Sequence, residues 1–233
     1  MTDDYTSELM DLAFRVGATL VGVADLNEVK TLSTHPPNLF ESYKYAISIA
    51  VSLPKSVFNL ITVENPGEIY AHHYRTSNLL LDQITLRLSE KIIQRGYSAL
   101  AIPASLSLGD NKLSSNAPHK AFARSAGLGW IGKNLLLITP NYGPRVRLAT
   151  VLTDIPLSPG KPLENFNCGI CSKCIEACPI KALKSFDFKG YPVKRENILD
   201  AVKCQTRLEK ISEMEFIGVS ICGICIKVCP IGK

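Results

Sequence analysis

Eight cysteines are the residues of this sequence whose type and spacing most clearly indicate chemistry. All eight lie from Cys168 onward, and the first 167 residues contain none. The first four form the run C-x2-C-x2-C-x3-C-P, from Cys168 to Pro179. This is the spacing of bacterial ferredoxins, in which three thiolates ligate one iron–sulfur cluster and the fourth ligates the other cluster. The run therefore predicts two clusters.

The other four cysteines allow the ligand sets of two [4Fe–4S] clusters to be completed. The segment CGICIKVCP keeps the C-x2-C-x3-C-P part of the motif but lacks the leading cysteine. Cys204, eighteen residues upstream of Cys222, can replace it. We predict that cluster 1 is ligated by Cys168, Cys171, Cys174 and Cys229, and cluster 2 by Cys178, Cys204, Cys222 and Cys225.

Other uses of the eight cysteines fit the sequence less well. The N-terminus, MTDDYTSELM, has no basic and apolar regions of a signal peptide, so we expect a cytoplasmic protein, in which a disulfide framework is disfavoured. Two zinc sites could use the same thiolates, but zinc ribbons normally pair two C-x2-C knuckles. A three-iron or incomplete cluster is an alternative that the ligand count does not require.

Composition is that of an ordinary globular protein. Of the 233 residues, 46% are hydrophobic and 20% charged, which is enough to bury a core. The longest apolar stretches are far shorter than a membrane span, so no membrane partner is expected. The net charge of +5 is not concentrated in any Lys/Arg run and favours anionic partners only weakly.

The first 160 residues must provide the elements that position any further site. The spacing of apolar residues predicts a helix with Thr6 or Ser7 as N-cap, ending at Gly17, and a long helix over residues 68–95, ending at Gly96. Strands are predicted at 19–25, 45–54, 97–105, 135–139 and 146–154, with a short helix at 119–126.

Together these elements predict an α+β fold. It consists of an α/β layered domain over residues 1–160 and a ferredoxin-like two-cluster domain over residues 161–233. The second domain is too small to build a hydrophobic core alone, so we expect the bound metal clusters to stabilise its fold.

A glycine-rich segment, AGLGWIGKN, matches two nucleotide-binding motifs but lacks the flanking elements or residues that each motif requires. The dinucleotide fingerprint requires a strand before it and a helix after it, and here the order is reversed. The phosphate-binding loop requires Ser or Thr after its lysine, and this chain has Asn134. A helix C-terminus with a glycine turn explains Gly127, while Trp130 could be a core residue or lie against a flat cofactor.

The chain as a whole resembles the epoxyqueuosine reductase family of cobalamin-dependent iron–sulfur enzymes. The resemblance lies in YAHHYRTSNLLLDQITLRL, AGLGWIGKNLLLITPNYG, LATVLTDIPL, NCGICSKCIEACPIKAL, Cys204 and CGICIKVCP. It implies that electrons pass from an external low-potential donor through two clusters to a bound corrinoid and on to a small substrate. The corrinoid contacts that it implies are His119, Lys120, Trp130, Lys133, Asn134 and Arg145.

Two departures from the family pattern affect the expected function. Leu113 stands where the family has a proton-donating acid, and Asp110 lies three residues too early, so Asp110 and Lys120 are only weak catalytic candidates. Family members often continue into a tRNA-associated repeat module, whereas this sequence stops at Lys233. We therefore expect a short paralogue that does not bind tRNA.

The sequence leaves open two alternatives to a corrinoid-linked reductase. The protein could transfer electrons to, or reactivate, a corrinoid protein without a substrate of its own. It could instead be a shortened epoxyqueuosine reductase that acts on tRNA.

Overall fold

The computed structural model describes residues 5–105, 117–164, 168–186, 188, 190–192 and 194–232. The chain divides into two compact units that are each discontinuous in sequence. Unit 1 consists of Met1–Ser52, Ser77–Gly129 and Arg147–Glu164. Unit 2 consists of Leu53–Thr76, Trp130–Val146 and Asn165–Lys233. This division differs from the boundary predicted at residue 160, because two segments that precede that boundary, Leu53–Thr76 and Trp130–Val146, belong to the unit that contains the cysteines.

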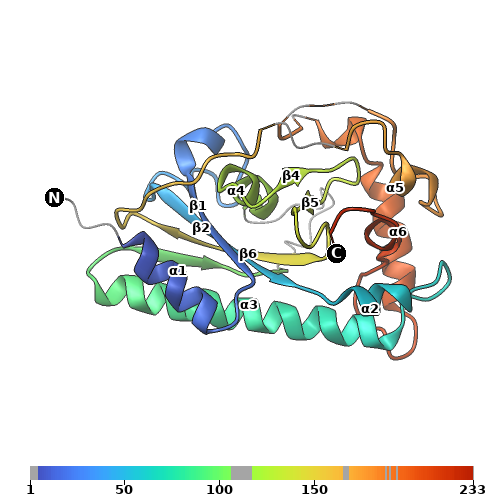
Figure 1. The fold of residues 1–233 in the computed structure, drawn as a ribbon, viewed down its shortest axis with the longest axis horizontal. Helices are drawn as coiled ribbons and strands as arrows, with labels where there is room; N and C mark the ends of the chain where they lie inside the picture. Colours follow the sequence, from blue (N-terminus) through green and yellow to red (C-terminus); the bar gives the residue numbers. More distant parts are fainter. Residues whose placement is uncertain are drawn as a thin grey trace. The chain divides into compact units, whose positions relative to one another are not determined.

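Unit 1 is built around a four-stranded sheet (Figure 1). Its strand order is β1 (Leu20–Asp25), β2 (Tyr45–Ser52), β6 (Val146–Thr153) and β3 (Ala99–Ile102). β1 pairs antiparallel with β2, and β3 pairs antiparallel with β6. The connections run through helices, which makes the fold α+β, as predicted from the sequence.

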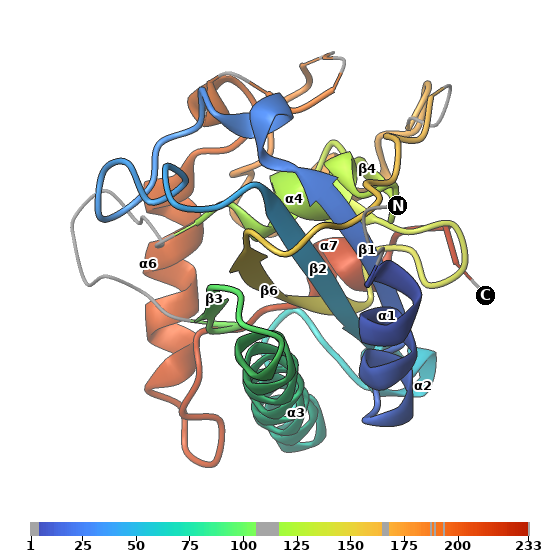
Figure 2. The ribbon, with the colours of Figure 1, turned by 90° about the vertical axis from the view of Figure 1, so that its left-hand side faces the viewer.

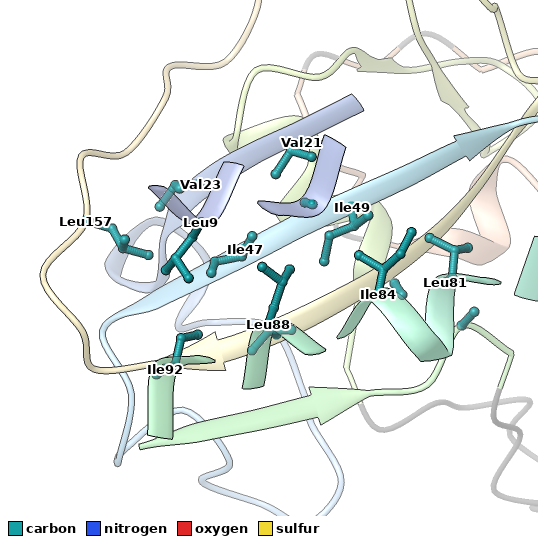
Figure 3. Packing of buried hydrophobic residues seen from close by; sticks show 14 of the residues in the cluster. Leu9, Val21, Val23, Ile47, Ile49, Leu81, Ile84, Leu88, Ile92 and Leu157 are labelled. Carbon is teal, nitrogen blue, oxygen red and sulfur yellow. The ribbon is translucent and has the colours of Figure 1, made fainter. Parts of the chain in front are cut away.

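One face of this sheet packs on α1 (Thr6–Arg15) and on the part of α3 (Glu68–Gln94) that starts at Ser77 (Figure 2). Alternate residues of β1 and β2 point to this face, because side chains of a strand alternate between its two sides. Figure 3 shows how these residues interdigitate with those of α3 at helical spacing. The buried side chains include Val21, Val23, Ile47, Ile49, Leu81, Ile84, Leu88 and Ile92.

The opposite face of β1 and β2 packs against α4 (His119–Ser125). Small residues on this face allow α4 and the turn that follows it to lie close to the backbone of the strands. A Cβ on Gly22 would lie 2.8 Å from the carbonyl oxygen of Ala126, so only glycine fits there. Because both faces are covered, the four central residues of β1 are all buried.

The predicted helix ends are partly right. Gly17 and Gly96 follow α1 and α3 with φ values of +112° and +83°, as expected for helix-terminating glycines. The predicted N-cap of α1 is wrong: Tyr5 occupies that position and makes no side-chain capping bond. The Thr6 hydroxyl instead accepts a hydrogen bond from the Ser158 backbone N–H at 2.7 Å.

Unit 2 combines the cysteine-rich segment with residues from two earlier parts of the chain. Its elements are α2 (Lys55–Asn59), the start of α3, the hairpin of β4 (Trp130–Ile131) and β5 (Leu137–Ile138), α5 (Lys173–Glu176), α6 (Ala201–Ser212) and α7 (Ile224–Lys227). Among the described residues, 3₁₀ turns lie at Leu26–Val29 in unit 1 and at Arg195–Asn197 in unit 2.

An apolar core holds unit 2 together. Phe58, Ile61 and Tyr70 from the earlier segment pack with Ile217 and Ile224 of the cysteine-rich segment. An aromatic contact adds to this core, since the ring centroids of Phe58 and Tyr70 lie 4.9 Å apart. The cysteine-rich segment thus obtains from residues 53–76 the hydrophobic partner that it cannot supply itself.

Within the described residues, no helix is both long and apolar enough to cross a lipid bilayer.

Candidate iron–sulfur site

Four cysteines line a single cavity in unit 2, and they are the four predicted for cluster 1. The thiols of Cys168, Cys171, Cys174 and Cys229 share this cavity with Pro230 and Ile231 and with three residues of the β4–β5 hairpin. Burial, and then the proximity of the other three thiols, raises the pKa of Cys174 to about 11. The structure therefore brings together residues that are up to 61 positions apart in the sequence.

The other four cysteines form a second group. Burial raises the pKa of Cys204, and its next largest influences are the neighbouring Cys222 and Cys178. Burial also raises the pKa of Cys225, followed by the effects of Cys222 and Cys204. Cys225 is affected by Cys174 of the first group as well, so the two groups are adjacent.

Two short helices explain why each group combines cysteines from both motifs, an arrangement called crossed below. Cys174 lies in α5 and Cys178 follows its end, while Cys225 lies in α7 and Cys229 follows its end. α5 and α7 pack together, so each helix gives one cysteine to one group and the next cysteine to the other. Gly223 starts α7 with a φ of +79°, and a Cβ there would lie 2.5 Å from Ile61 Cδ1.

The chemistry of the donors fits iron–sulfur clusters. All eight cysteines are free thiols and half-buried. Within the part of the chain that the structure describes, no three His, Cys, Asp or Glu side chains converge closely enough to hold one metal ion directly. The first four thiols instead surround a volume, and thiolates around a volume are the donor set of a [4Fe–4S] cubane.

Lys133 and Asn134 of the AGLGWIGKN segment form hydrogen bonds with the backbone of the cysteine-rich segment. Lys133 Nζ donates a hydrogen bond to the carbonyl oxygen of Gly169 at 2.8 Å, within the loop from Cys168 to Cys171. Asn134 Nδ2 donates to the carbonyl oxygen of Cys225 at 3.3 Å, and its Oδ1 accepts from the Leu136 N–H at 3.1 Å. Both residues line the cavity, so they form a wall of the cluster 1 site.

Trp130 and Arg145 are also in unit 2. Trp130 is buried in β4, and Arg145 is buried with 4% of its surface exposed. Burial raises the pKa of Cys229, and this rise is opposed first by a hydrogen bond from the Ile231 backbone N–H and then by the positive charge of Arg145. Arg145 therefore favours the thiolate form of a predicted cluster ligand.

His119 and Lys120 lie in unit 1, at the start of α4. His119 Nε2 lies 3.1 Å from the carbonyl oxygen of Pro103, and Nδ1 lies 2.8 Å from Thr150 Oγ1. Because a carbonyl only accepts, Nε2 carries the proton and Nδ1 accepts from the Thr150 hydroxyl. The six predicted corrinoid contacts are thus divided between the two units. Asp110 and Leu113 lie outside the described residues.

The burial of His119 predicts that stability falls in mild acid. Burial lowers the pKa of His119 from 6.5 to about 4, so between these values only the unfolded chain takes up the proton. The free energy of unfolding should therefore decrease as the pH falls from 7 toward 4, by up to about 3 kcal/mol from this residue. Urea denaturation at pH 5 and pH 7 would measure this. His119→Gln should reduce the pH dependence, and an unchanged dependence would contradict the assignment.

Sequence reasoning missed two residues of the site. Arg207 donates from Nε to the sulfur of Cys222 at 3.4 Å. Its position three residues after Cys204, on the same face of α6, is the signal that could have indicated it. Gly143 lies against the backbone of Ile231, next to Cys229 and Pro230. No local pattern predicts that contact.

Comparison with known proteins agrees with this site. Residues 167–232 match the family of 4Fe–4S double cluster binding domains. The chain is 31% identical over 213 residues to epoxyqueuosine reductase of Bacillus cereus, which covers 86% of this chain and 51% of that protein. It is 35% identical over 118 residues to tetrachloroethene reductive dehalogenase of Sulfurospirillum multivorans, covering 48% of this chain and 23% of that protein.

Solved structures show the same fold. The reductive dehalogenase NpRdhA in complex with 3-bromo-4-hydroxybenzoic acid matches 95% of this chain and 31% of its own, with a TM-score of 0.75 and 24% identity. Epoxyqueuosine reductase from Streptococcus thermophilus matches 96% of this chain and 65% of its own, with a TM-score of 0.63 and 21% identity.

The predicted resemblance is confirmed: the chain is homologous to epoxyqueuosine reductases and contains a double [4Fe–4S] cluster-binding domain. It spans about half the length of the curated epoxyqueuosine reductase that it matches.

Proposed function

We propose that this homologue of epoxyqueuosine reductases is an iron–sulfur oxidoreductase that transfers electrons through two [4Fe–4S] clusters to a bound corrinoid and on to a small substrate. The observation that carries the proposal is the sorting of eight free cysteines into two adjacent groups, with the AGLGWIGKN segment forming a wall of one of them. An external low-potential donor would supply the electrons.

The proposed ligands are those derived from the sequence. Cys168, Cys171, Cys174 and Cys229 would hold cluster 1, and Cys178, Cys204, Cys222 and Cys225 would hold cluster 2. The grouping of the thiols in unit 2 supports both sets. Cluster 1 would lie next to Lys133 and Asn134, two of the proposed corrinoid contacts, which supports cluster 1 as the cluster nearer the corrinoid.

A corrinoid would supply low-valent cobalt as the reductant of the substrate. Of the six residues proposed to contact it, Trp130 offers a flat face, and Lys120, Lys133, Asn134 and Arg145 offer donors to amide or phosphate oxygens. His119 fits this role least, because it is neutral at pH 7 and both of its ring nitrogens have protein partners. We therefore propose no histidine ligand to cobalt.

The chain's own residues would mainly position the redox groups. Lys133 fixes the loop between Cys168 and Cys171 through the Gly169 carbonyl, and Asn134 fixes Cys225. A buried guanidinium, that of Arg145, offsets negative charge beside Cys229. Such fixed donors lower the reorganisation that electron transfer requires, because they do not need to move when the charge changes.

Anaerobic reconstitution with iron, sulfide and cobalamin tests the proposal. After gel filtration we expect eight irons and one cobalt per chain, the count that two [4Fe–4S] clusters and one corrinoid require. Full iron without cobalt would contradict the corrinoid-linked reductase and favour the alternative, an electron-transfer or reactivation partner of a corrinoid protein. A chain that binds neither would contradict both.

Activity on tRNA is the other alternative and needs a separate assay. With reductant and cobalamin supplied, tRNA that contains epoxyqueuosine should give no queuosine if the substrate is a small molecule. Formation of queuosine would instead assign the chain the activity of the relatives that it matches.

A further inference from the structure

Arg207 is a charged side chain in contact with a thiol of the second cysteine group. Its Nε donates to Cys222 Sγ at 3.4 Å, and its charge acts on Cys204, which precedes it by one turn of α6. The first group has a different environment, in which Lys133 binds a loop carbonyl and Arg145 acts on Cys229. In the second group, Arg207 thus adds a charged side-chain donor to the backbone donor Ala182 N–H, which bonds Cys178 Sγ at 3.3 Å.

A second hydrogen bond holds the guanidinium of Arg207 in place. Its terminal Nη2 donates to the carbonyl oxygen of Val63, which belongs to the N-terminal segment of unit 2. A planar guanidinium can make both bonds at once because its N–H groups point in fixed directions. A lysine ammonium would keep the charge but could not reproduce this pair of contacts.

A donor of this kind changes the reduction potential of the cluster that it contacts. When a cluster takes up one electron it gains one negative charge, and no bond to the protein forms or breaks. A nearby positive charge and an N–H···S hydrogen bond stabilise the reduced form more than the oxidised form. Both are among the factors that set the potentials of iron–sulfur clusters.

We propose that Arg207 is a positioning residue that raises the reduction potential of cluster 2 and leaves cluster 1 unaffected. The inference rests on the proposed function, but only on its two clusters and not on the corrinoid. It assigns Arg207 a role in electron transfer that is separate from holding iron.

The test is a redox titration of the reconstituted protein, with dithionite as reductant and electron paramagnetic resonance as readout. Arg207→Met should lower the potential of one cluster by at least the equivalent of a tenfold change in its reduction equilibrium, about 59 mV. Arg207→Lys should give a smaller decrease, because the charge remains and the N–H···S bond is lost. Lys210→Gln is the control, since it removes an exposed positive charge from the same helix.

The shifted signal is assigned with the double variant Cys174→Ala/Cys229→Ala, which should retain only cluster 2. Introducing Arg207→Met into this variant should shift the remaining signal. Unchanged potentials in Arg207→Met and Arg207→Lys with full iron content would overturn the inference and leave the proposed function intact. Equal loss of iron in both, without a shift, would show a purely structural role and also overturn it. If the parent chain binds no cluster, the proposed function fails as well.

Discussion

The double variant Cys174→Ala/Cys229→Ala is expected to lose half of its iron and to keep one intact cluster. Both thiols line the same cavity, although they are 55 positions apart in the sequence. Removing both therefore destroys one proposed ligand set and leaves the other complete. Iron analysis and the visible spectrum after anaerobic reconstitution would measure the result.

The matched control is Cys178→Ala/Cys229→Ala, which removes the same number of thiols. In the proposed arrangement these two cysteines belong to different clusters, so both clusters lose a ligand and most of the iron should be lost. If each cluster took its ligands from one contiguous motif, Cys174→Ala/Cys229→Ala would damage both clusters. Equal iron loss in the two double variants would thus contradict the crossed ligand sets.

Gly143→Ala is expected to displace the segment that carries Cys229 and to abolish cluster 1. Gly143 has a φ of +56°, and a Cβ there would overlap the carbonyl oxygen of Ile231. The glycine cannot move away, because its N–H donates to the Thr139 carbonyl at 2.8 Å and its own carbonyl accepts from the Thr139 N–H at 2.9 Å. Residues 230 and 231 would have to shift instead, and both line the cluster 1 cavity.

Gly67→Ala separates this effect from backbone strain. Gly67 has a φ of +83°, and a Cβ there would meet nothing within 4 Å. We expect it to cost about 1 kcal/mol of stability, as for a non-glycine residue in the left-handed region, and to keep both clusters. Thermal denaturation and iron content of the two variants would be compared. Full iron in Gly143→Ala would show that the final segment does not hold a cluster ligand.

Local patterns in the sequence were sufficient for most of unit 1. The apolar spacing predicts α3 because Leu81, Ile84, Leu88 and Ile92 must share a buried face of a helix. The strands β1, β2 and β6 are short apolar runs bounded by turn residues, which makes them recognisable. In unit 2, the cysteine spacing predicts the two ligand sets because it matches the geometry of a cluster, and which thiols bind iron stays a prediction.

Which segments of the chain form unit 2 could not be predicted from local patterns. Nothing in residues 53–76 indicates that Ile61 and Tyr70 pack against Ile217, because such contacts depend on tertiary folding and not on local periodicity. Lys133 and Asn134 are predicted as corrinoid contacts only from the resemblance, while the structure shows that Lys133 bonds the Gly169 carbonyl and Asn134 the Cys225 carbonyl in α7. Whether they also touch a corrinoid stays a prediction.

The crossed ligand sets also bear on how the protein is made. A chain is synthesised from its N-terminus, and N-terminal parts generally fold first. In the proposed arrangement cluster 2 requires Cys225 and cluster 1 requires Cys229, so neither can be completed while the ribosome is still translating residues 168–224. The apolar core that residues 53–76 share with the cysteine-rich segment offers a way to shape both sites before metal arrives. Both clusters would then be completed only after Cys225 and Cys229 have been synthesised, at sites whose shape the protein core has already set.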